Sequence, residues 1–203
     1  YEQLLEVAKE VGSKSAEAQG SNNLGAVEFS RGRLTQAGRQ FERAHDIHKE
    51  SGNRSGQASA LSNLAAVHRW SGELDKARQL QNHALEMRRD LGQIAGVAVS
   101  SIQLAEIALD TCSLNETEKS IQEARIVQET VQLPSIDADI ALVEGRLRMT
   151  RGESKGAEKS LREALEKFQN IDSQHKQARA SLALAELSHR NGDHLQAMID
   201  AKS

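Results

Sequence analysis

The feature that most constrains this chain is a pattern that returns every fortieth residue without a slip. Residues 21–44 set it out: a leucine followed by glycine, a second glycine, and two alanines that flank a large apolar residue. The second glycine is at position 32, and its equivalents are positions 72, 112, 152 and 192. A fixed period of this length is typical of stacked supersecondary units. The sequence therefore predicts a repeat array, not a domain built around a single catalytic centre.

Each repeat is expected to fold as two antiparallel helices joined at the glycine. In the first repeat, Ala18 and Leu24 belong to an apolar face at helical spacing, which predicts a front helix over 15–31. Gly32 ends that helix, because glycine adopts the left-handed conformation of a helix C-terminus without steric cost. A back helix follows over 34–51, and the later repeats are expected to follow the same plan.

This skeleton resembles the tetratricopeptide repeat, whose signature is W-x2-L-G-x2-Y followed by A-x3-F and a closing proline. The match here is Leu-Gly at 24–25 and Ala-x3-Phe at 37–41, and similar residues recur along nearly the whole chain. Ser21 and Glu28 replace the aromatic residues of the signature, and the closing proline is missing. The repeat is also longer than the usual length of about 34 residues. In this it is similar to the repeats of kinesin light chain, of spindle-orienting G-protein regulators, and of bacterial signalling ATPases and transcription activators.

The resemblance implies an all-α fold, a right-handed superhelical solenoid of stacked antiparallel helix hairpins (an α-α superhelix). Residues 1–203 are expected to form a single array. Its parts are the tail of a preceding repeat (1–12), full repeats (15–52, 55–92, 94–132 and 134–172) and a partial repeat (174–203). Because both ends fall inside a repeat, we expect a segment of a longer protein. Half-hairpins also expose apolar residues (Leu4, Val7, Leu195 and Met198), which predicts a homodimer through uncapped repeat ends.

Composition argues against several classes of protein. The net charge is −3 and there is no basic run, which argues against a nucleic-acid-binding protein. The most continuous apolar stretch, around residues 94–99, is far shorter than the roughly 18–20 residues of a membrane span. Cys112 is the only cysteine, so no disulfide can form within the chain, and a reducing, cytoplasmic compartment is expected.

The sequence predicts neither an enzyme nor a metal or cofactor site. His45 and His48 are three residues apart, the spacing of a metal pair on one helix face, but no third ligand accompanies them. Cys112 has no histidine nearby in its repeat to act as a base. Phosphate-binding glycine loops and nucleophile elbows are absent from the sequence.

One position of the repeat and its equivalents in the other copies form a column, and two such columns allow local predictions. Cys112 occupies a turn where the other repeats have glycine, so either it adopts the strained left-handed conformation or its turn differs from the others. Alanine occupies one front-helix position in all five repeats, which predicts a close contact between helices there. These alanines are Ala18, Ala58, Ala98, Ala138 and Ala178.

The resemblance places function on the front helices, which line the concave side where such arrays hold partners. We therefore predict a non-catalytic scaffold that binds a protein or an extended peptide in its groove, within a larger bacterial regulatory protein. The alternative is an effector-sensing domain of a transcription regulator or signalling ATPase, which a compact pocket would favour. The predicted groove residues are Asn22, Asn23, Phe29, Ser62, Asn63, Arg69, Trp70, Ile102, Gln103, Glu106, Leu109, Leu142, Arg146 and Met149.

Asn23 and Asn63 are the sharpest of these predictions. In repeats of the kinesin-light-chain type, the asparagine of the N-L-G or N-L-A triplet faces the groove and bonds the backbone of an extended peptide. An amide suits this role because it carries both a donor and an acceptor. The alternative is that both asparagines bond only to neighbouring helices. Trp70 is likewise either an exposed anchor for a partner or a lid over a helix end.

Overall fold

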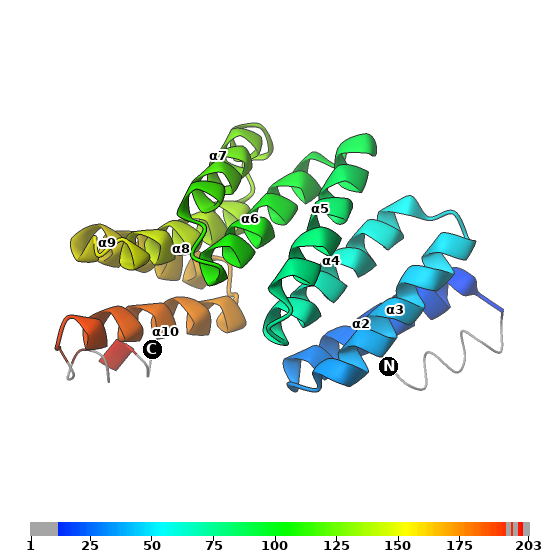
Figure 1. Ribbon diagram of the computed structural model, residues 1–203, viewed down its shortest axis with the longest axis horizontal. Coiled ribbons are helices and arrows are strands. Elements are labelled where there is room, and N and C mark those ends of the chain that lie inside the picture. Colours follow the sequence, from blue (N-terminus) through cyan, green and yellow to red (C-terminus); the bar gives the residue numbers. More distant parts are fainter. Residues whose placement is uncertain (1–11, 194–195, 197–198, 201–203) are drawn as a thin grey trace. The chain divides into compact units, whose positions relative to one another are not determined.

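The computed structural model describes residues 12–193, 196 and 199–200, so Leu4, Val7, Leu195 and Met198 lie outside the described residues. Within that part of the chain the regular secondary structure is helical (Figure 1). The helices are α2 (Lys14–Ser30), α3 (Leu34–Glu50), α4 (Arg54–Trp70), α5 (Leu74–Asp90), α6 (Ile94–Asp110), α7 (Leu114–Val131), α8 (Pro134–Thr150), α9 (Ser154–Asn170) and α10 (Gln174–Arg190).

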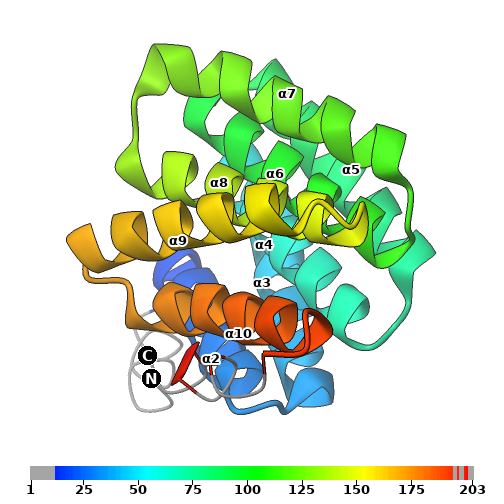
Figure 2. The same cartoon turned by 90° about the vertical axis from the view of Figure 1, so that its left-hand side faces the viewer.

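The chain divides into two compact units, residues 1–100 and residues 101–203, and the division falls inside α6. In the first unit, α2 pairs with α3, α4 pairs with α5, and α3 packs against α4. In the second unit, α8 pairs with α9, which packs against α10 (Figure 2). The predicted all-α architecture of stacked antiparallel hairpins is confirmed.

Each described helix is followed by a residue in the left-handed conformation, and the turn after α7 differs from the others because the Gln132 N–H donates to Gln128 O. Positive φ recurs at every twentieth residue from Gly12 to Gly192, and the exceptions to glycine are Cys112, Gln132 and Asp172. The φ of Cys112 is 54°, so the left-handed alternative for this residue is confirmed. Its N–H donates to Leu109 O at 3.0 Å, as the N–H of Gly32 does to Phe29 O at 2.9 Å. The third turn therefore keeps the common geometry without glycine.

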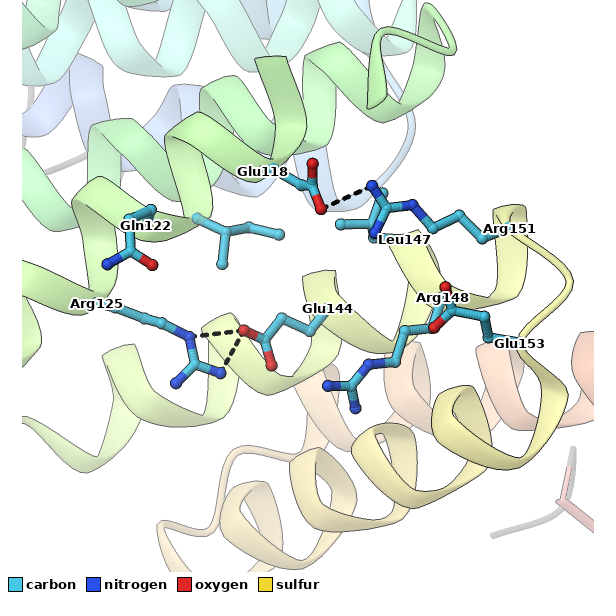
Figure 3. A pocket seen from close by; sticks show the side chains of 9 residues that line it. Glu118, Gln122, Arg125, Glu144, Leu147, Arg148, Arg151 and Glu153 are labelled. Carbon is cyan, nitrogen blue, oxygen red and sulfur yellow. Dashed lines mark hydrogen bonds and ion pairs between the residues drawn. The ribbon is translucent and has the colours of Figure 1, made fainter. Parts of the chain in front are cut away.

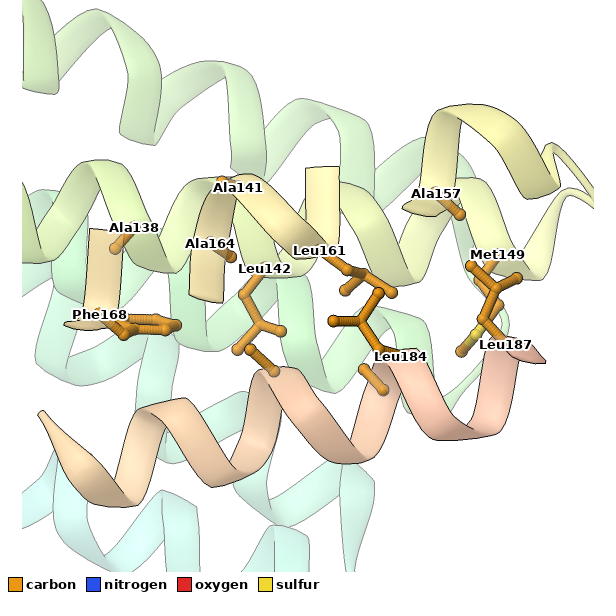
Figure 4. Packing of buried hydrophobic residues seen from close by; sticks show 12 residues of the cluster. Ala138, Ala141, Leu142, Met149, Ala157, Leu161, Ala164, Phe168, Leu184 and Leu187 are labelled. Carbon is orange, nitrogen blue, oxygen red and sulfur yellow. The ribbon is translucent and has the colours of Figure 1, made fainter. Parts of the chain in front are cut away.

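Small and aliphatic side chains form the cores of both units. In the second unit, α8, α9 and α10 share one cluster around Leu142, Leu161 and Phe168, all at most 1 % exposed (Figure 4). In the first unit, Phe41 packs with Leu64 and Val67, while Phe29 borders the same cluster from α2. Burying these apolar surfaces on both sides of each helix fixes the orientation of the front helices.

The alanine column is buried in its first four members, and Ala178 is the exception. Ala18, Ala58, Ala98 and Ala138 have no exposed surface. Ala58 shares a cluster with Ala84, and Ala138 shares one with Ala164, in each case on the back helix of the same hairpin. Ala178, on α10, is exposed instead. The prediction of a close contact is therefore wrong at this position.

Candidate protein-binding surface

The front helices α2 and α4 are joined by an amide pair on the side predicted to bind partners. Asn63 Nδ2 donates to Asn22 Oδ1 at 2.8 Å, and both side chains are partly exposed. On α2 itself, Gln19 Nε2 donates to Asn23 Oδ1 at 3.0 Å. Asn63 therefore does bond a neighbouring helix, which was one of the two alternatives for it.

The amide pair also retains capacity for a partner. Across the described residues, Asn63 Oδ1 and Asn22 Nδ2 make no further hydrogen bond. The first is an acceptor and the second a donor, and they lie on two different helices. In an extended chain the N–H and C=O of a single residue point to the same side, so one acceptor and one donor suit such a residue. Bonding between the helices and binding of a partner are thus compatible.

An aromatic pair lies at the C-terminal ends of the same two helices. The rings of Phe29 and Trp70 meet edge to face, with centroids 6.4 Å apart and an interplanar angle of 83°. Phe29 is partly buried against the core of the first unit, whereas Trp70 is 66 % exposed. This exposure favours the interpretation of Trp70 as an anchor for a partner over its interpretation as a lid on a helix end.

Small residues separate the amide pair from the aromatic pair. Ala26 on α2 is exposed and Ala66 on α4 is partly exposed. Residues three, four and seven apart lie on one helix face, so Asn63, Ala66 and Trp70 form one line along α4. Asn22, Ala26 and Phe29 form the matching line along α2. We call these six residues the amide–aromatic strip.

Six of the predicted groove residues lie in the interior instead, and they are corrected here. Leu142 and Met149 belong to the core of the second unit, where they face neighbouring helices. Ser62 donates to Gln81 Oε1 at 3.0 Å inside the first unit. Because their side chains are covered, these residues cannot offer them to a partner. The six are Ser62, Ile102, Glu106, Leu109, Leu142 and Met149.

The remaining predicted residues, Arg69, Gln103 and Arg146, are partly buried. Arg146 Nη2 lies 3.4 Å from Asp110 Oδ1, so this guanidinium is engaged in an ion pair between α8 and the C-terminal half of α6. Arg69 and Gln103 also have interactions of their own. Each of the three side chains therefore already interacts with another group of the protein.

The second unit contains a cluster of charged side chains that the sequence did not predict to lie together. Arg179 on α10 pairs with the buried Glu106 on α6, and Lys176 Nζ lies 2.6 Å from Asp139 Oδ2. Burial raises the pKa of the Asp139 carboxyl, although Lys176 acts in the opposite direction. These partners belong to different repeats, so no pattern within one repeat reveals them. The charged side chains of this cluster therefore pair with one another within the second unit.

A polar cavity of about 330 Å³ lies between α7 and α8 (Figure 3). Arg125 Nε donates to Glu144 Oε1 at 2.7 Å, and Arg151 Nη2 lies 2.7 Å from Glu118 Oε1. Arg148 donates to Ser160 Oγ at 2.5 Å. Two of the three arginines form ion pairs with glutamates, and because the lining holds three arginines and three glutamates, its formal charges cancel. Its lining is Glu118, Ile121, Gln122, Arg125, Glu144, Leu147, Arg148, Arg151 and Glu153.

His45 and His48, the pair at metal-ligand spacing, lie near the C-terminal end of α3. His48 is buried, and burial, followed by the nearby His45, lowers its pKa. In the described part of the chain, no group of three or more His, Cys, Asp or Glu side chains could hold a metal ion. Nor is any described helix both long and apolar enough to cross a bilayer.

Comparison with known proteins confirms the resemblance and the fold. Residues 14–90 match the family description "Tetratricopeptide repeat". A comparison with curated protein sequences finds no match. Among solved structures, apo RapI is similar at a TM-score of 0.83 and 16% identity, over 98% of this chain and 70% of RapI.

Two further structures are similar to this chain. The Rap protein complexed with competence and sporulation factor gives a TM-score of 0.81 at 15% identity, over 93% of this chain and 53% of Rap. Repeats of a putative kinesin light chain from Podosopora anserina give 0.61 at 14% identity, over 91% of both chains. At these identities the similarity establishes a shared fold, that of helical solenoids of the tetratricopeptide-repeat type.

Proposed function

We propose that this chain, whose residues 14–90 belong to the tetratricopeptide repeat family, is a non-catalytic scaffold that binds an extended segment of a partner protein. The observation that carries the proposal is the Asn22–Asn63 amide pair, which joins two front helices and still offers one donor and one acceptor. The amide–aromatic strip of α2 and α4 would be the binding surface.

Binding would use the two unused atoms of the pair. Asn63 Oδ1 would accept a backbone N–H of the partner, and Asn22 Nδ2 would donate to a backbone carbonyl. Ala26 and Ala66 carry no side chain beyond Cβ, so a partner backbone can approach both helices closely. Main-chain bonds of this kind give affinity without requiring one particular partner sequence.

The setting we propose is a larger bacterial regulatory protein in the cytoplasm. The 40-residue repeat, which resembles those of bacterial signalling ATPases and transcription activators, supports a regulatory setting, and a single cysteine fits a reducing compartment. Sensing of an effector is the second candidate. It is favoured by the fold similarity to the Rap protein complexed with competence and sporulation factor.

The proposal is tested by selecting binders from a phage-displayed library of random decapeptides on the immobilised chain. The selected peptides are then titrated against Ala66→Arg, which places a long charged side chain in the middle of the strip. We expect this variant to weaken binding at least about tenfold, because the partner backbone can no longer approach α4. Asn82→Arg, on the exposed side of the back helix α5, adds the same charge elsewhere and should bind normally. Equal affinity for both variants would contradict the proposed surface.

A further inference from the structure

The amide pair and the aromatic pair are separated by a fixed distance along both helices. Asn63 and Trp70 are seven residues apart on α4, as Asn22 and Phe29 are on α2. With a rise of 1.5 Å per residue, this spacing is about 10 Å along each helix axis. An extended chain covers the same distance in about three residues, at 3.1–3.4 Å each.

We infer that the partner segment carries a large apolar side chain three positions from the residue whose backbone N–H and C=O bind the amide pair, and that this side chain packs against Trp70 and Phe29. The inference rests on the proposed function and adds the chemistry of the partner to it. The amide–aromatic strip would then recognise both the backbone of the partner and the spacing between the bonded residue and the apolar side chain.

The aromatic pair is suited to this contact. In a chain with 2% aromatic residues, Trp70 leaves two-thirds of its surface uncovered while its ring is braced edge-on against Phe29. Phe29 is in turn held by the core, so the site is largely fixed before binding. A pre-positioned aromatic surface loses little conformational entropy when a partner covers it, which is the character of an interface anchor.

The charged residues of the turn after α2 indicate a further property of the partner sequence. Arg31 and Arg33 follow Phe29 in the turn after α2, and both lie near Glu28, at 3.7 and 3.1 Å. One carboxylate facing two exposed guanidinium groups leaves this turn with an excess of positive charge. We therefore expect a partner with an acidic residue beyond the apolar side chain, since complementary charge steers association.

Trp70 makes the inference directly measurable because it is the only tryptophan in the chain. The probes are decapeptides selected from the random library. When the protein is saturated with such a peptide, the fluorescence emission of Trp70 should shift to shorter wavelength, because the indole ring is then shielded from water. Trp70→Ala should weaken binding about tenfold or more, with at most a small fall in melting temperature, because two-thirds of the side chain is exposed and only its edge contact with Phe29 is lost. Leu182→Ala removes an equally exposed side chain, 67 % accessible, from α10 and should change nothing.

Two scans of one selected peptide locate the spacing. N-methylation at successive positions identifies the peptide N–H that is bonded, and alanine substitution identifies the apolar anchor. We expect the two sensitive positions to lie three residues apart. A peptide that is sensitive to Ala66→Arg but leaves the Trp70 emission unchanged, or that shows another spacing, overturns this inference and leaves the proposed function intact. A library that yields no binder contradicts both.

Discussion

The imidazole of His48 lies against the backbone of Gly56, so closely that a β-carbon on Gly56 would come within 2.4 Å of the His48 ring. The relationship recurs one repeat later, where Arg88 crosses Gly96 and the corresponding distance to its Cδ is 3.0 Å. In both places a buried side chain near the end of a back helix covers the first turn of the next front helix. At Gly56 the lack of space requires glycine, whereas at Gly96 a small shift of the flexible Arg88 side chain would accommodate a β-carbon.

Gly56→Ala should therefore destabilise the protein by about 1–3 kcal/mol, because the His48 ring must leave its site. Gly38→Ala is the matched control, since its β-carbon would lie 3.7 Å from Val67 Cγ1, an ordinary contact. There the gain in helix propensity should dominate and stabilise by about 0.5–1 kcal/mol. Urea unfolding measures both variants, and a similar free energy of unfolding for the two would show that His48 moves aside freely.

Cys112→Gly should stabilise the protein by about 0.4–1 kcal/mol. The cysteine holds a φ of 54°, which L-residues adopt at a cost, and glycine removes that cost while increasing the entropy of the unfolded chain. Cys112→Ser keeps the β-carbon and should leave the stability nearly unchanged. An unchanged or lowered melting temperature for the glycine variant would mean that the third turn carries no strain.

Ala138→Leu should cost about 1–3 kcal/mol, because this fully buried alanine shares its cluster with Ala164 and Phe168. Ala178→Leu tests the same position of the repeat where it is exposed, and we expect a change of less than about 0.5 kcal/mol. Thermal unfolding of the two variants separates the explanations. Equal tolerance would show that the alanine column does not mark a helix contact.

Asp139 should make the protein more stable as the pH falls. Burial raises its pKa in the folded state, so the folded protein holds this proton more readily than the unfolded chain does. The contribution is complete below the unfolded pKa, about 3.9, and is lost as the pH rises through the folded value. Asp139→Asn abolishes it. The free energy of unfolding of the native protein, relative to this variant, should therefore increase from pH 7 towards pH 4, and a constant difference would contradict the assignment.

The sequence was most informative where each repeat determines its own structure. Helix ends were predicted to within one residue, for example at Ser30 and Glu50, because glycine turns recur at fixed positions. It was least informative about contacts between repeats. The pairing of Glu106 with Arg179 joins residues 73 apart, and no periodic pattern encodes which front helices approach closely enough to bury Leu142.

The same distinction explains the candidate site. The positions of Asn22, Asn63 and Trp70 on the front helices followed from the resemblance, whereas the bond between the two asparagines did not. That bond depends on how α2 and α4 are spaced, which the aliphatic core determines. A helical pattern identifies the face of a residue, but its partner depends on packing with the adjacent repeat.

Calorimetric titration of a selected decapeptide into Asn63→Ala shows whether the amide pair binds the backbone of a partner. Removing the amide leaves a peptide group of the partner unpaired at a cost of about 1–3 kcal/mol. We predict an affinity roughly 5- to 150-fold weaker than that of the native chain. The unfolding free energy should fall by no more than about 1 kcal/mol, since the lost Asn22 bond is partly exposed. Unchanged affinity, together with a larger loss of stability, would make Asn63 purely structural and contradict this role of the amide pair.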